Sequence, residues 1–388
     1  MLSAGFGSGK LRKRLLFIST IFPSKWSNKH AAYTLQILRA LQEYFDIDVI
    51  NPLPWHLKIK NRIDNSYVMD GLSITHPTYW YSPGLLRSYY GMFYYWSIRS
   101  CAMKLIKARR PDVLLSLWLY PDGWATNKIA NLYGIPTLVR AIGTDANRLV
   151  VGSDLAKRTV ETIARSKKVI CVSEALKGKL ISVGADPSQL IVLYNGVDRN
   201  LFYKMDRNLL RTELGFSAED VLILFVGNLL QTKGLDELAD AFKLLKRIDQ
   251  FKRTKLIVAG TGTYESTFRN RLEAAGMLAD AIFMGSCALP VVAKLMNVAD
   301  VACLPSYSEG LPNVILEALC CNVKTVATEV GGIPELAQQH QNIYLVPPKD
   351  SEQLAAALAT AIEAECVDDL AEDIGSWAEY AKKMLVYV

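Results

Sequence analysis

The stretch "VLILFVGNLLQTKGLDELADAF" (221–242) contains the unit from which the fold can be predicted. It begins with a continuous apolar run, turns at Gly227, and continues from Leu235 as an amphipathic helix pattern. A strand that is apolar at every position, and not only at alternate ones, is typical of a parallel sheet covered by helices on both faces. The stretch therefore predicts a strand, turn and helix of a doubly wound α/β domain.

The same unit recurs along almost the whole chain in two series. The first series has apolar runs at 15–20, 46–52, 112–118, 137–143, 168–173 and 190–196. The second has runs at 221–228, 255–260, 281–285, 301–306, 324–332 and 342–347. Because 388 residues are too many for one ordinary core, we predict two Rossmann-like parallel-sheet domains. The polar, strand-free segment 197–220 separates the series, which places the domains at 1–205 and 206–370.

Composition and charge narrow the class of protein. Hydrophobic residues make up 51% and charged residues 21%, which favours a well-packed globular protein over a disordered one. The net charge of +6 is too small to demand nucleic acid, but it favours an anionic ligand or lipid surface. The seven cysteines are odd in number and lack C-x-x-C spacing, so we expect buried thiols in a reducing cytoplasm.

The N-terminal region and the apolar runs also bear on membranes. "GKLRKRLLFISTIFPS" (9–24) has a basic stretch before an apolar one, as a signal peptide does, but it has no small-residue cleavage site. We expect a first β-strand there. No apolar run approaches the ~18 to 20 residues of a membrane span, so any membrane contact is expected to be peripheral.

Ligands of open parallel sheets bind beyond the carboxyl ends of the strands, so the loops after strands are the candidate sites. Lys233 and Gly234 lead from such a loop into a helix, where unpaired backbone amides, the helix dipole and a lysine suit a diphosphate. An ordinary strand-to-helix turn with a solvated lysine is the alternative. Gly260 and Gly262 follow another strand, but Glu265 stands where a dinucleotide fingerprint needs a third glycine. A tight turn that approaches something in the cleft is the better interpretation.

The strongest local signal is "SYSEGLPNVILEALCC" (306–321). Pro312 can occupy the first turn of a helix, which would leave backbone amides pointing at an anion. The amides concerned are those near Gly310, Leu311, Asn313 and Val314.

Two glutamates flank these amides, Glu309 on the loop and Glu317 inside the predicted helix. Ionised carboxylates accept hydrogen bonds from hydroxyl groups, so the set suits a nucleotide sugar, with one glutamate for the ribose and one for the donor sugar. As an alternative, Glu317 would only complement the helix dipole, for about 0.3 to 1 kcal/mol. That alternative leaves Glu309 unexplained.

Two segments of the first half are candidates for the acceptor side. Gly143, Thr144 and Asp145 follow a strand and could line the cleft, although alone they are ordinary loop residues. Segment 82–112 mixes aromatic and basic residues at helical spacing, which suits a membrane interface. A long core helix with a basic end is the alternative for that segment.

Taken together, these motifs resemble the retaining glycosyltransferases of the large glycogen-synthase-like family, glycosyltransferase family four, which has the two-Rossmann GT-B fold. The likeness follows the family order through "YPDGWA", "GIPTLVRAIGTD", "VICVSEALKGKL", "LYNGVDRNLF", "FVGNLLQTKG", "LIVAGTG", "PSYSEGLPNVILEALCC" and "EVGGIPEL". "SWAEYAKKMLVYV" (376–388) resembles the closing helix of the family, which implies that segment 371–388 crosses back to the N-terminal domain.

The resemblance implies that Lys233 contacts the donor diphosphate, Glu309 reaches the donor sugar and Glu317 binds the ribose. Amides from Gly310 to Val314 would hold phosphate. Three positions depart from the family pattern. Asn228 replaces a basic residue often paired with the lysine, Ile142 stands where His or Arg is common, and Ala31 stands at a glycine position.

The reaction implied is a metal-independent hexosyl transfer from a nucleotide-diphosphate sugar, linked to UDP or GDP, to an acceptor hydroxyl with retained configuration. No cofactor is expected. The acceptor would be a carbohydrate or a lipid-linked group in polysaccharide or glycolipid assembly, with a cytoplasmic protein peripheral at the inner face of the cell membrane. A nucleotide-sugar epimerase of the same fold, or an inactive nucleotide-sugar-binding protein, is the alternative.

Overall fold

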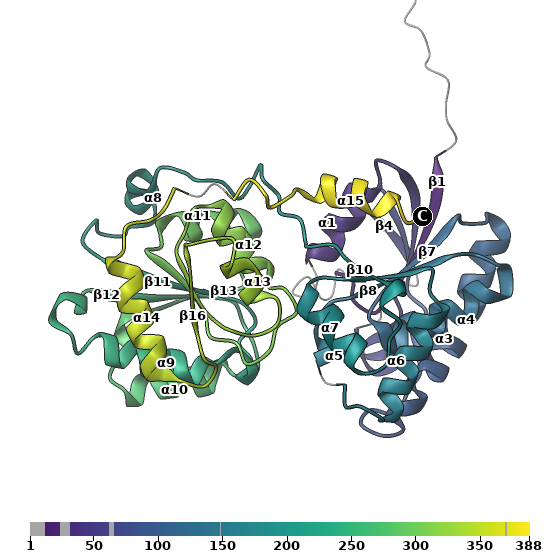
Figure 1. Cartoon of the computed structure of the whole chain (residues 1–388), viewed down its shortest axis with the longest axis horizontal. Helices are drawn as coiled ribbons and strands as arrows, with labels where there is room; N and C mark the ends of the chain where they lie inside the picture. Colours follow the sequence, from purple (N-terminus) through teal and green to yellow (C-terminus); the bar gives the residue numbers. More distant parts are fainter. Residues whose placement is uncertain (1–11, 24–31, 62–65, 148, 369–370) are drawn as a thin grey trace, which may run out of the picture.

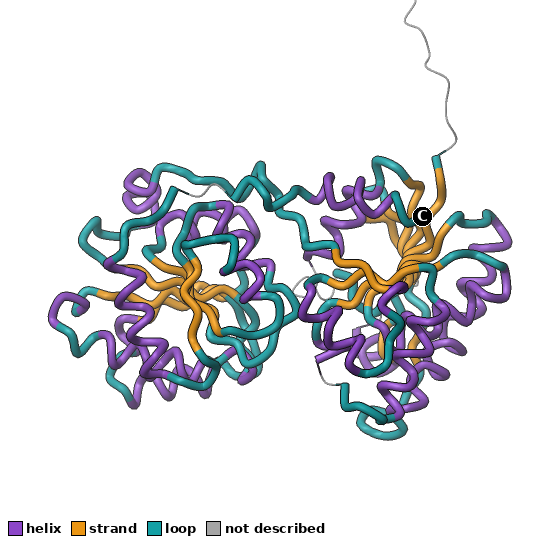
Figure 2. Tube along the Cα trace, viewed as in Figure 1, coloured by secondary structure: helices purple, strands orange, loops and turns teal. Residues whose placement is uncertain are grey.

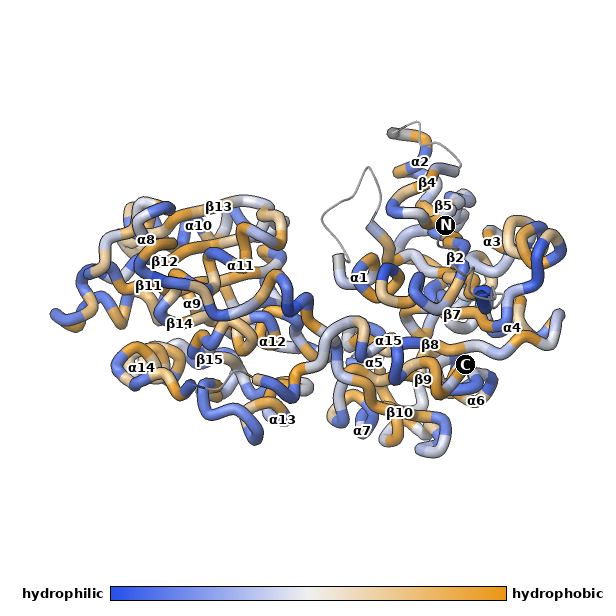
Figure 3. The backbone as a smooth tube through the Cα atoms, turned by 90° about the horizontal axis from the view of Figure 1, so that it is seen from above, coloured by the Kyte–Doolittle hydropathy of each residue, from blue (hydrophilic) through white to orange (hydrophobic). Residues whose placement is uncertain are grey.

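The computed structural model describes residues 12–23, 32–61, 66–147, 149–368 and 371–388, and it has two α/β domains side by side (Figure 1). In each domain the strands form a central sheet with helices on both sides (Figure 2). The predicted fold class is therefore confirmed. In Figure 3 the hydrophobic colour gathers on the strands of both domains, as expected for sheets buried on both faces.

The first domain is built on an eight-stranded sheet in the order β10-β9-β8-β7-β1-β2-β5-β4. All neighbouring strands are parallel except β4, which is antiparallel to β5. Six of the strands correspond to the predicted apolar runs, and the first of them is the strand expected near the N-terminus. Their bounds are β1 (Lys13–Ile18), β2 (Phe45–Ile50), β7 (Val113–Leu117), β8 (Thr137–Ala141), β9 (Lys168–Cys171) and β10 (Leu190–Val192).

Four short strands of this domain were not predicted from the sequence. β4 (Ser66–Met69) and β5 (Leu72–Thr75) form a hairpin at the sheet edge, and β3 (Leu53–Pro54) pairs with β6 (Thr78–Tyr79). Asp70 and Gly71 both have positive φ, 51° and 75°, as a two-residue type I′ hairpin turn requires. The Asp-Gly pair could therefore have predicted this hairpin from the sequence.

Helices cover both faces of the first sheet. α1 packs on one face together with α15 of the chain's C-terminal end, while α3 and α4 pack on the other. The helices are α1 (Ala32–Leu41), α2 (Trp55–Asn61), α3 (Tyr90–Ala108), α4 (Trp124–Tyr133), α5 (Thr144–Asn147), α6 (Asp154–Arg165) and α7 (Glu174–Ser182), with short helical turns at Arg87–Tyr89, Leu119–Gly123 and Pro187–Gln189.

The second domain has a six-stranded, fully parallel sheet in the order β13-β12-β11-β14-β15-β16. Its strands are those predicted, namely β11 (Val221–Val226), β12 (Thr254–Ala259), β13 (Ala281–Gly285), β14 (Val301–Leu304), β15 (Thr325–Thr328) and β16 (Ile343–Val346). Its helices are α9 (Leu235–Leu245), α10 (Glu265–Ala274), α11 (Leu289–Val298), α12 (Asn313–Cys320), α13 (Ile333–Ala337) and α14 (Ser351–Glu363), with 3-10 turns at Gln231–Lys233, Asp249–Phe251 and Leu278–Asp280.

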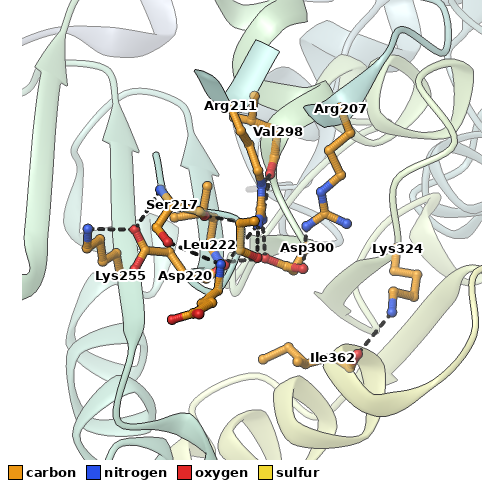
Figure 4. Close-up of polar contacts among 12 residues, drawn as sticks. Arg207, Arg211, Ser217, Asp220, Leu222, Lys255, Val298, Asp300, Lys324 and Ile362 are labelled. Atoms are coloured by element: carbon orange, nitrogen blue, oxygen red, sulfur yellow. Dashed lines mark hydrogen bonds and ion pairs between the residues drawn. The ribbon is translucent and has the colours of Figure 1, made fainter. Parts of the chain in front are cut away.

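The connection between the domains is anchored to the second sheet by α8 (Arg207–Leu214) and the polar contacts in Figure 4. Arg211 is buried, and its Nη2 donates to Oδ2 of Asp300 at 2.7 Å and to the carbonyl of Val298 at 3.0 Å. The same carboxylate accepts the amide of Leu222 at 2.7 Å, at the start of β11. These contacts pair the buried guanidinium with a carboxylate and fix the entry into the second domain. The expected boundary at 205 and 206 stays a prediction.

The last helix, α15 (Trp377–Leu385), packs on the first domain against α1. It begins with a capping box in which Ser376 and Glu379 satisfy each other's backbone amides. Trp377, Tyr380 and Met384 are buried in the core of the first domain. The chain therefore returns from the second domain to the first, and the bounds 371–388 of the returning segment stay a prediction.

Candidate active site

Lys233 lies in the turn between β11 and α9, at the carboxyl end of the second sheet. Gly234 follows it with φ +66°, and a Cβ atom there would lie 1.9 Å from the carbonyl oxygen of Pro305. Only glycine fits this turn without a shift of the loop after β14. The amide of Tyr307 on that loop also donates to the carbonyl of Thr232 at 2.9 Å. The sequence therefore brings the lysine turn against the loop that carries Glu309.

Lys233 and Glu309 form an ion pair, with Nζ 2.5 Å from Oε1. Their side chains are 22% and 12% exposed, so the pair is screened from most of the solvent but is not fully buried. The sequence analysis predicted both residues and gave each a separate role. It did not predict their contact, which places a positive and a negative group at one point of the site.

Glu317 has a different environment inside α12. Its carboxylate accepts no hydrogen bond from any residue in the described ranges, and burial raises its pKa to about 7. A carboxylate that is largely removed from water and has no donor is unfavourable in the folded chain. The helix has no acidic residue in its first turn, so the alternative in which Glu317 only complements the helix dipole is wrong.

The start of α12 differs by one residue from the prediction. Pro312 is the N-cap, with an extended backbone at ψ 121°, and the helix begins at Asn313. Proline was expected in the first turn, but its own ψ is not helical here. The helix start still leaves amides free. Within the described part of the chain, none of the predicted amides donates a hydrogen bond, namely those of Gly310, Leu311, Asn313 and Val314.

Gly260 and Gly262 follow β12 and do mark a close approach, but its partner is a neighbouring loop of the same domain. A Cβ atom on Gly260 would lie 1.8 Å from the carbonyl oxygen of Gly227, and one on Gly262 would lie 2.1 Å from that of Leu229. The expectation that this turn approaches something in the cleft is wrong as to the partner, because both glycines lie against the loop that follows β11. Asn228 lies on the same loop and is exposed. Contact of these three residues with the donor stays a prediction.

Gly143 brings the loop after β8 against the Glu309 loop of the other domain. Its φ is +125°, and a Cβ atom there would lie 2.8 Å from Cα of Gly310. Asp145 uses both carboxylate oxygens to hold its own loop, since Oδ1 accepts the amides of Ile142 and Gly143 at 3.2 and 3.0 Å and Oδ2 that of Leu119 at 3.1 Å. Asp145 thus has a structural function, and contact with an acceptor stays a prediction.

Three polar side chains of the first domain bond the loop after β14 or the start of α12, and none of them was identified from the sequence. Asn147 Nδ2 donates to the carbonyl of Glu309 at 2.8 Å and to Oγ of Ser308 at 2.9 Å. Ser173 Oγ donates to the carbonyl of Gly310 at 3.2 Å, and Asn195 Nδ2 donates to Oδ1 of Asn313. The candidate site is therefore assembled from both domains.

Glu335 adds a fourth contact between the domains. It stands at the start of α13, and its two oxygens accept the amides of Glu174 and Ala175 at 2.9 and 2.7 Å, which are the first amides of α7. Tyr194 donates to the same carboxylate at 2.9 Å. A carboxylate of one domain thus caps a helix of the other, and this cap stabilises the observed approach of the domains.

The aromatic and basic segment 82–112 is partly core and partly surface. Tyr94 and Tyr95 are buried against the first sheet, as the core-helix alternative expected. Other large apolar side chains of this region are exposed, namely Trp80, Leu85, Leu86, Tyr89 and Trp96. Neither interpretation of the segment is sufficient alone.

Other expectations concern the thiols, the metal site and the glycine loop. Four of the seven cysteines are buried, two are half-buried and Cys366 is exposed. Among the described residues, no three His, Cys, Asp or Glu side chains gather as a metal site would, and no helix is long and apolar enough to cross a bilayer. Ala31 lies outside the described residues.

Comparison with protein families gives two matches that together span most of the chain. Residues 31–201 match the model of Glycosyltransferase Family 4, and residues 206–384 match that of Glycosyl transferases group 1. A relative over nearly the full length is the putative teichuronic acid biosynthesis glycosyltransferase TuaC of Bacillus subtilis. It is 26% identical over an alignment of 385 positions, which covers 93% of each chain. A D-inositol 3-phosphate glycosyltransferase of Catenulispora acidiphila is 27% identical over 260 residues, covering 64% of this chain and 60% of the relative.

Solved structures share the arrangement of both domains. Sucrose-phosphate synthase of Thermosynechococcus elongatus superposes with a TM-score of 0.82 and 16% identity, over 97% of this chain and 98% of its own. The Anabaena protein Alr3699/HepE, solved in complex with UDP and glucose, superposes with a TM-score of 0.74 and 19% identity, over 97% and 99% of the two chains.

Proposed function

The chain belongs to the family-four glycosyltransferases with the GT-B fold, and we propose that it transfers a hexose from a nucleotide-diphosphate sugar to an acceptor hydroxyl with retained anomeric configuration. The observation that carries this proposal is the contact of Lys233 with Glu309 on the loop that leads into α12, the helix that carries Glu317. The lysine and the unpaired amides suit the diphosphate, and the two carboxylates suit sugar hydroxyls.

Each side chain has a distinct task in this proposal. Glu317 accepts hydrogen bonds from the ribose hydroxyls, which supply the donors that its carboxylate lacks in the free protein. Lys233 and the α12 amides neutralise the charge that grows on the diphosphate as it leaves. Glu309 holds the donor sugar and stabilises positive charge at its anomeric carbon. Asn147 fixes the backbone of Glu309 from the other domain.

The reaction proceeds on one face of the donor sugar. The acceptor oxygen forms a bond to the anomeric carbon while the bond from that carbon to the phosphate oxygen breaks. The acceptor proton passes to a phosphate oxygen of the leaving group, so no second carboxylate nucleophile is needed. The protein holds both substrates in this geometry.

UDP or GDP is the proposed nucleotide, and the Anabaena neighbour solved with UDP supports the first. The acceptor is a carbohydrate or a lipid-linked group. The exposed Trp80 and Trp96, 59% and 60% accessible, lie in a region with exposed basic residues, including Arg87 and Lys104. This combination supports peripheral contact with an anionic membrane at the inner face of the cell membrane, where a lipid-linked acceptor would lie.

A screen of nucleotide sugars followed by product analysis tests the proposal. A donor at 100 times its Kd should stabilise the protein by about 2.7 kcal/mol, visible as a rise in Tm. Incubation of that donor with candidate acceptors should give a glycosylated product. Conversion of the donor without any acceptor would indicate an epimerase instead, and binding without any product over the acceptor set would indicate an inactive binding protein.

Metal independence is tested separately by transfer in excess EDTA. Lys233 and the α12 amides together can offset the diphosphate charge, so we expect activity to persist. Complete loss that Mg²⁺ or Mn²⁺ restores would contradict this part of the proposal.

A further inference from the structure

Arg140 on β8 is a buried cation with one hydrogen-bond partner. It is 1% exposed, its guanidinium lies 5.1 Å from the ring of Tyr380 on α15, and its Nη2 donates to Oδ1 of Asn195. Nε and Nη1 have no acceptor in the described part of the structure. Arg211, the other buried arginine among the described residues, has a carboxylate and several carbonyls as partners. A buried charge without a carboxylate is costly, and in the described structure the amide of Asn195 and the ring of Tyr380 are the groups that offset this cost.

Two side-chain amides, those of Asn195 and Asn313, link Arg140 to the proposed donor site by hydrogen bonds. Asn195 lies in the loop after β10 and is buried. Its Nδ2 donates to Oδ1 of Asn313, the first residue of α12. A chain of two hydrogen bonds therefore runs from the interior of the first domain to the helix start that carries the proposed phosphate amides.

The arginine fixes which groups donate and which accept along these two hydrogen bonds. A guanidinium donates hydrogen bonds and accepts none, so the amide of Asn195 must turn its oxygen toward Arg140 and its nitrogen toward Asn313. Asn313 must then present its own oxygen to Asn195. Its Nδ2 is left as a donor, and it makes no hydrogen bond with any described residue.

We propose that Arg140 and Asn195 are positioning residues that hold the Asn313 side chain with its Nδ2 toward a phosphate oxygen of the donor. This inference rests on the proposed function. A phosphate oxygen accepts hydrogen bonds, so Nδ2 attracts it, whereas the Oδ1 of a flipped amide would repel it. The side chain thereby adds a donor to the backbone amides at the start of α12, in a site where Asn228 and Ile142 replace residues that are often basic.

Asn195→Asp is the variant that reverses the last amide. The introduced carboxylate accepts from Arg140 and cannot donate to Asn313, so Asn313 turns its nitrogen to that carboxylate and its oxygen to the phosphate. The new ion pair with Arg140 should keep Tm at or above that of the unchanged protein. Calorimetric titration should show UDP and GDP binding at least tenfold weaker, while uridine and guanosine, which lack phosphate, bind within twofold of their original affinity.

Five further variants exclude simpler causes. Asn127→Asp makes the same change at a buried asparagine that bonds Thr162 and Ser166 within the first domain, and it should leave nucleotide affinity within twofold. Asn313→Leu should weaken the binding of UDP and GDP as Asn195→Asp does. The double variant, which combines Asn195→Asp with Asn313→Leu, should bind them no more weakly than Asn313→Leu alone. Arg140→Lys, which still only donates, should retain more affinity than Arg140→Gln, which can donate or accept.

The outcomes separate this inference from the proposed function. If the unchanged protein binds neither UDP nor GDP, the proposed function fails and the inference fails with it. If it binds one of them and Asn195→Asp binds it equally well, only the positioning inference is overturned. A double variant that is weaker than Asn313→Leu would also overturn it, because the introduced carboxylate would then act through its charge and not through Asn313.

Discussion

Glu309 and Glu317 lie eight residues apart, yet their surroundings are opposite. Glu309 is on a loop, is paired with Lys233 at 2.5 Å, and has its carbonyl held by Asn147 of the other domain. Glu317 is inside α12, accepts no hydrogen bond from the described residues, and has its pKa raised to about 7 by burial. The first carboxylate is positioned by the protein itself. The second has hydrogen-bonding capacity that no described residue of the protein satisfies.

The difference indicates how the proposed site divides binding from catalysis. A carboxylate and a lysine in contact form a rigid group suited to stabilising charge that develops during the reaction. An unpaired carboxylate destabilises the free protein and gains hydrogen bonds when ribose hydroxyls bind. We therefore expect changes at the Lys233 and Glu309 contact to affect turnover, and changes at Glu317 to affect stability and donor affinity.

The largest effect is expected for Lys233→Ala. Loss of the positive charge removes stabilisation of the leaving diphosphate and leaves Glu309 unpaired, so kcat should fall by about 10²–10³. Steady-state kinetics at saturating donor measures this. Lys294→Ala, which breaks an exposed ion pair with Glu213, is the matched control and should keep kcat. A kcat of Lys233→Ala within threefold of the unchanged enzyme would contradict the assignment.

The next effect concerns the free energy of unfolding of Glu317→Gln. The pKa of Glu317 is about 7 in the folded chain against an ordinary value of 4.5, so its ionisation costs stability progressively as pH rises from 4.5 to 7. Glutamine removes this cost. The variant should be more stable at pH 8 by up to about 3 kcal/mol, with a much smaller gain at pH 5.

Urea unfolding at the two pH values checks this prediction. Glu352→Gln on α14, where the glutamate is exposed, is the control and should change neither value. Equal stability of Glu317→Gln and the unchanged protein at pH 8 would mean that Glu317 has a partner or full hydration in solution.

A smaller effect is expected in the pH dependence of nucleotide binding. Ribose hydroxyls donate to the ionised form of Glu317, so affinity is complete above pH 7 and declines as pH falls below it. Binding should be about tenfold weaker at pH 6 than at pH 8. Calorimetric titration of the unchanged protein and Glu317→Gln separates this effect from titration of the phosphate. Parallel pH profiles for both proteins would contradict it.

The elements that the sequence predicted correctly depend on local pattern. Both sheets followed from continuous apolar runs. Lys233, Glu309 and Glu317 were chosen from motif positions in the loops and helices that follow strands, and their roles stay predictions. The helix start was predicted one residue early, because proline is common in first turns and only its ψ distinguishes the N-cap. The β4–β5 hairpin was missed despite its Asp-Gly turn, because its strands are short and lie at the sheet edge.

The contacts between the domains could not be predicted in the same way. Asn147 and Glu309 are 162 residues apart, and Asn195 and Asn313 are 118 apart. Nothing in the local pattern of either segment specifies its partner, since each pair depends on how the two sheets approach. The ion pair of Lys233 with Glu309 has the same origin, because it requires two loops after different strands to meet. Strand ends indicated the region of the site, and only the structure gave its pairings.

In the proposed mechanism Glu309 acts in the transition state while Glu317 acts in binding. Steady-state donor kinetics of Glu309→Ala and Glu317→Ala is the measurement that separates these two roles. Once circular dichroism has established that both variants are folded, Glu317→Ala should raise the donor KM about 10- to 100-fold with little change in kcat. Glu309→Ala should instead lower kcat by about 10²-fold or more. Near-normal kcat and KM in both variants, or the reverse assignment of the two effects, would contradict the account.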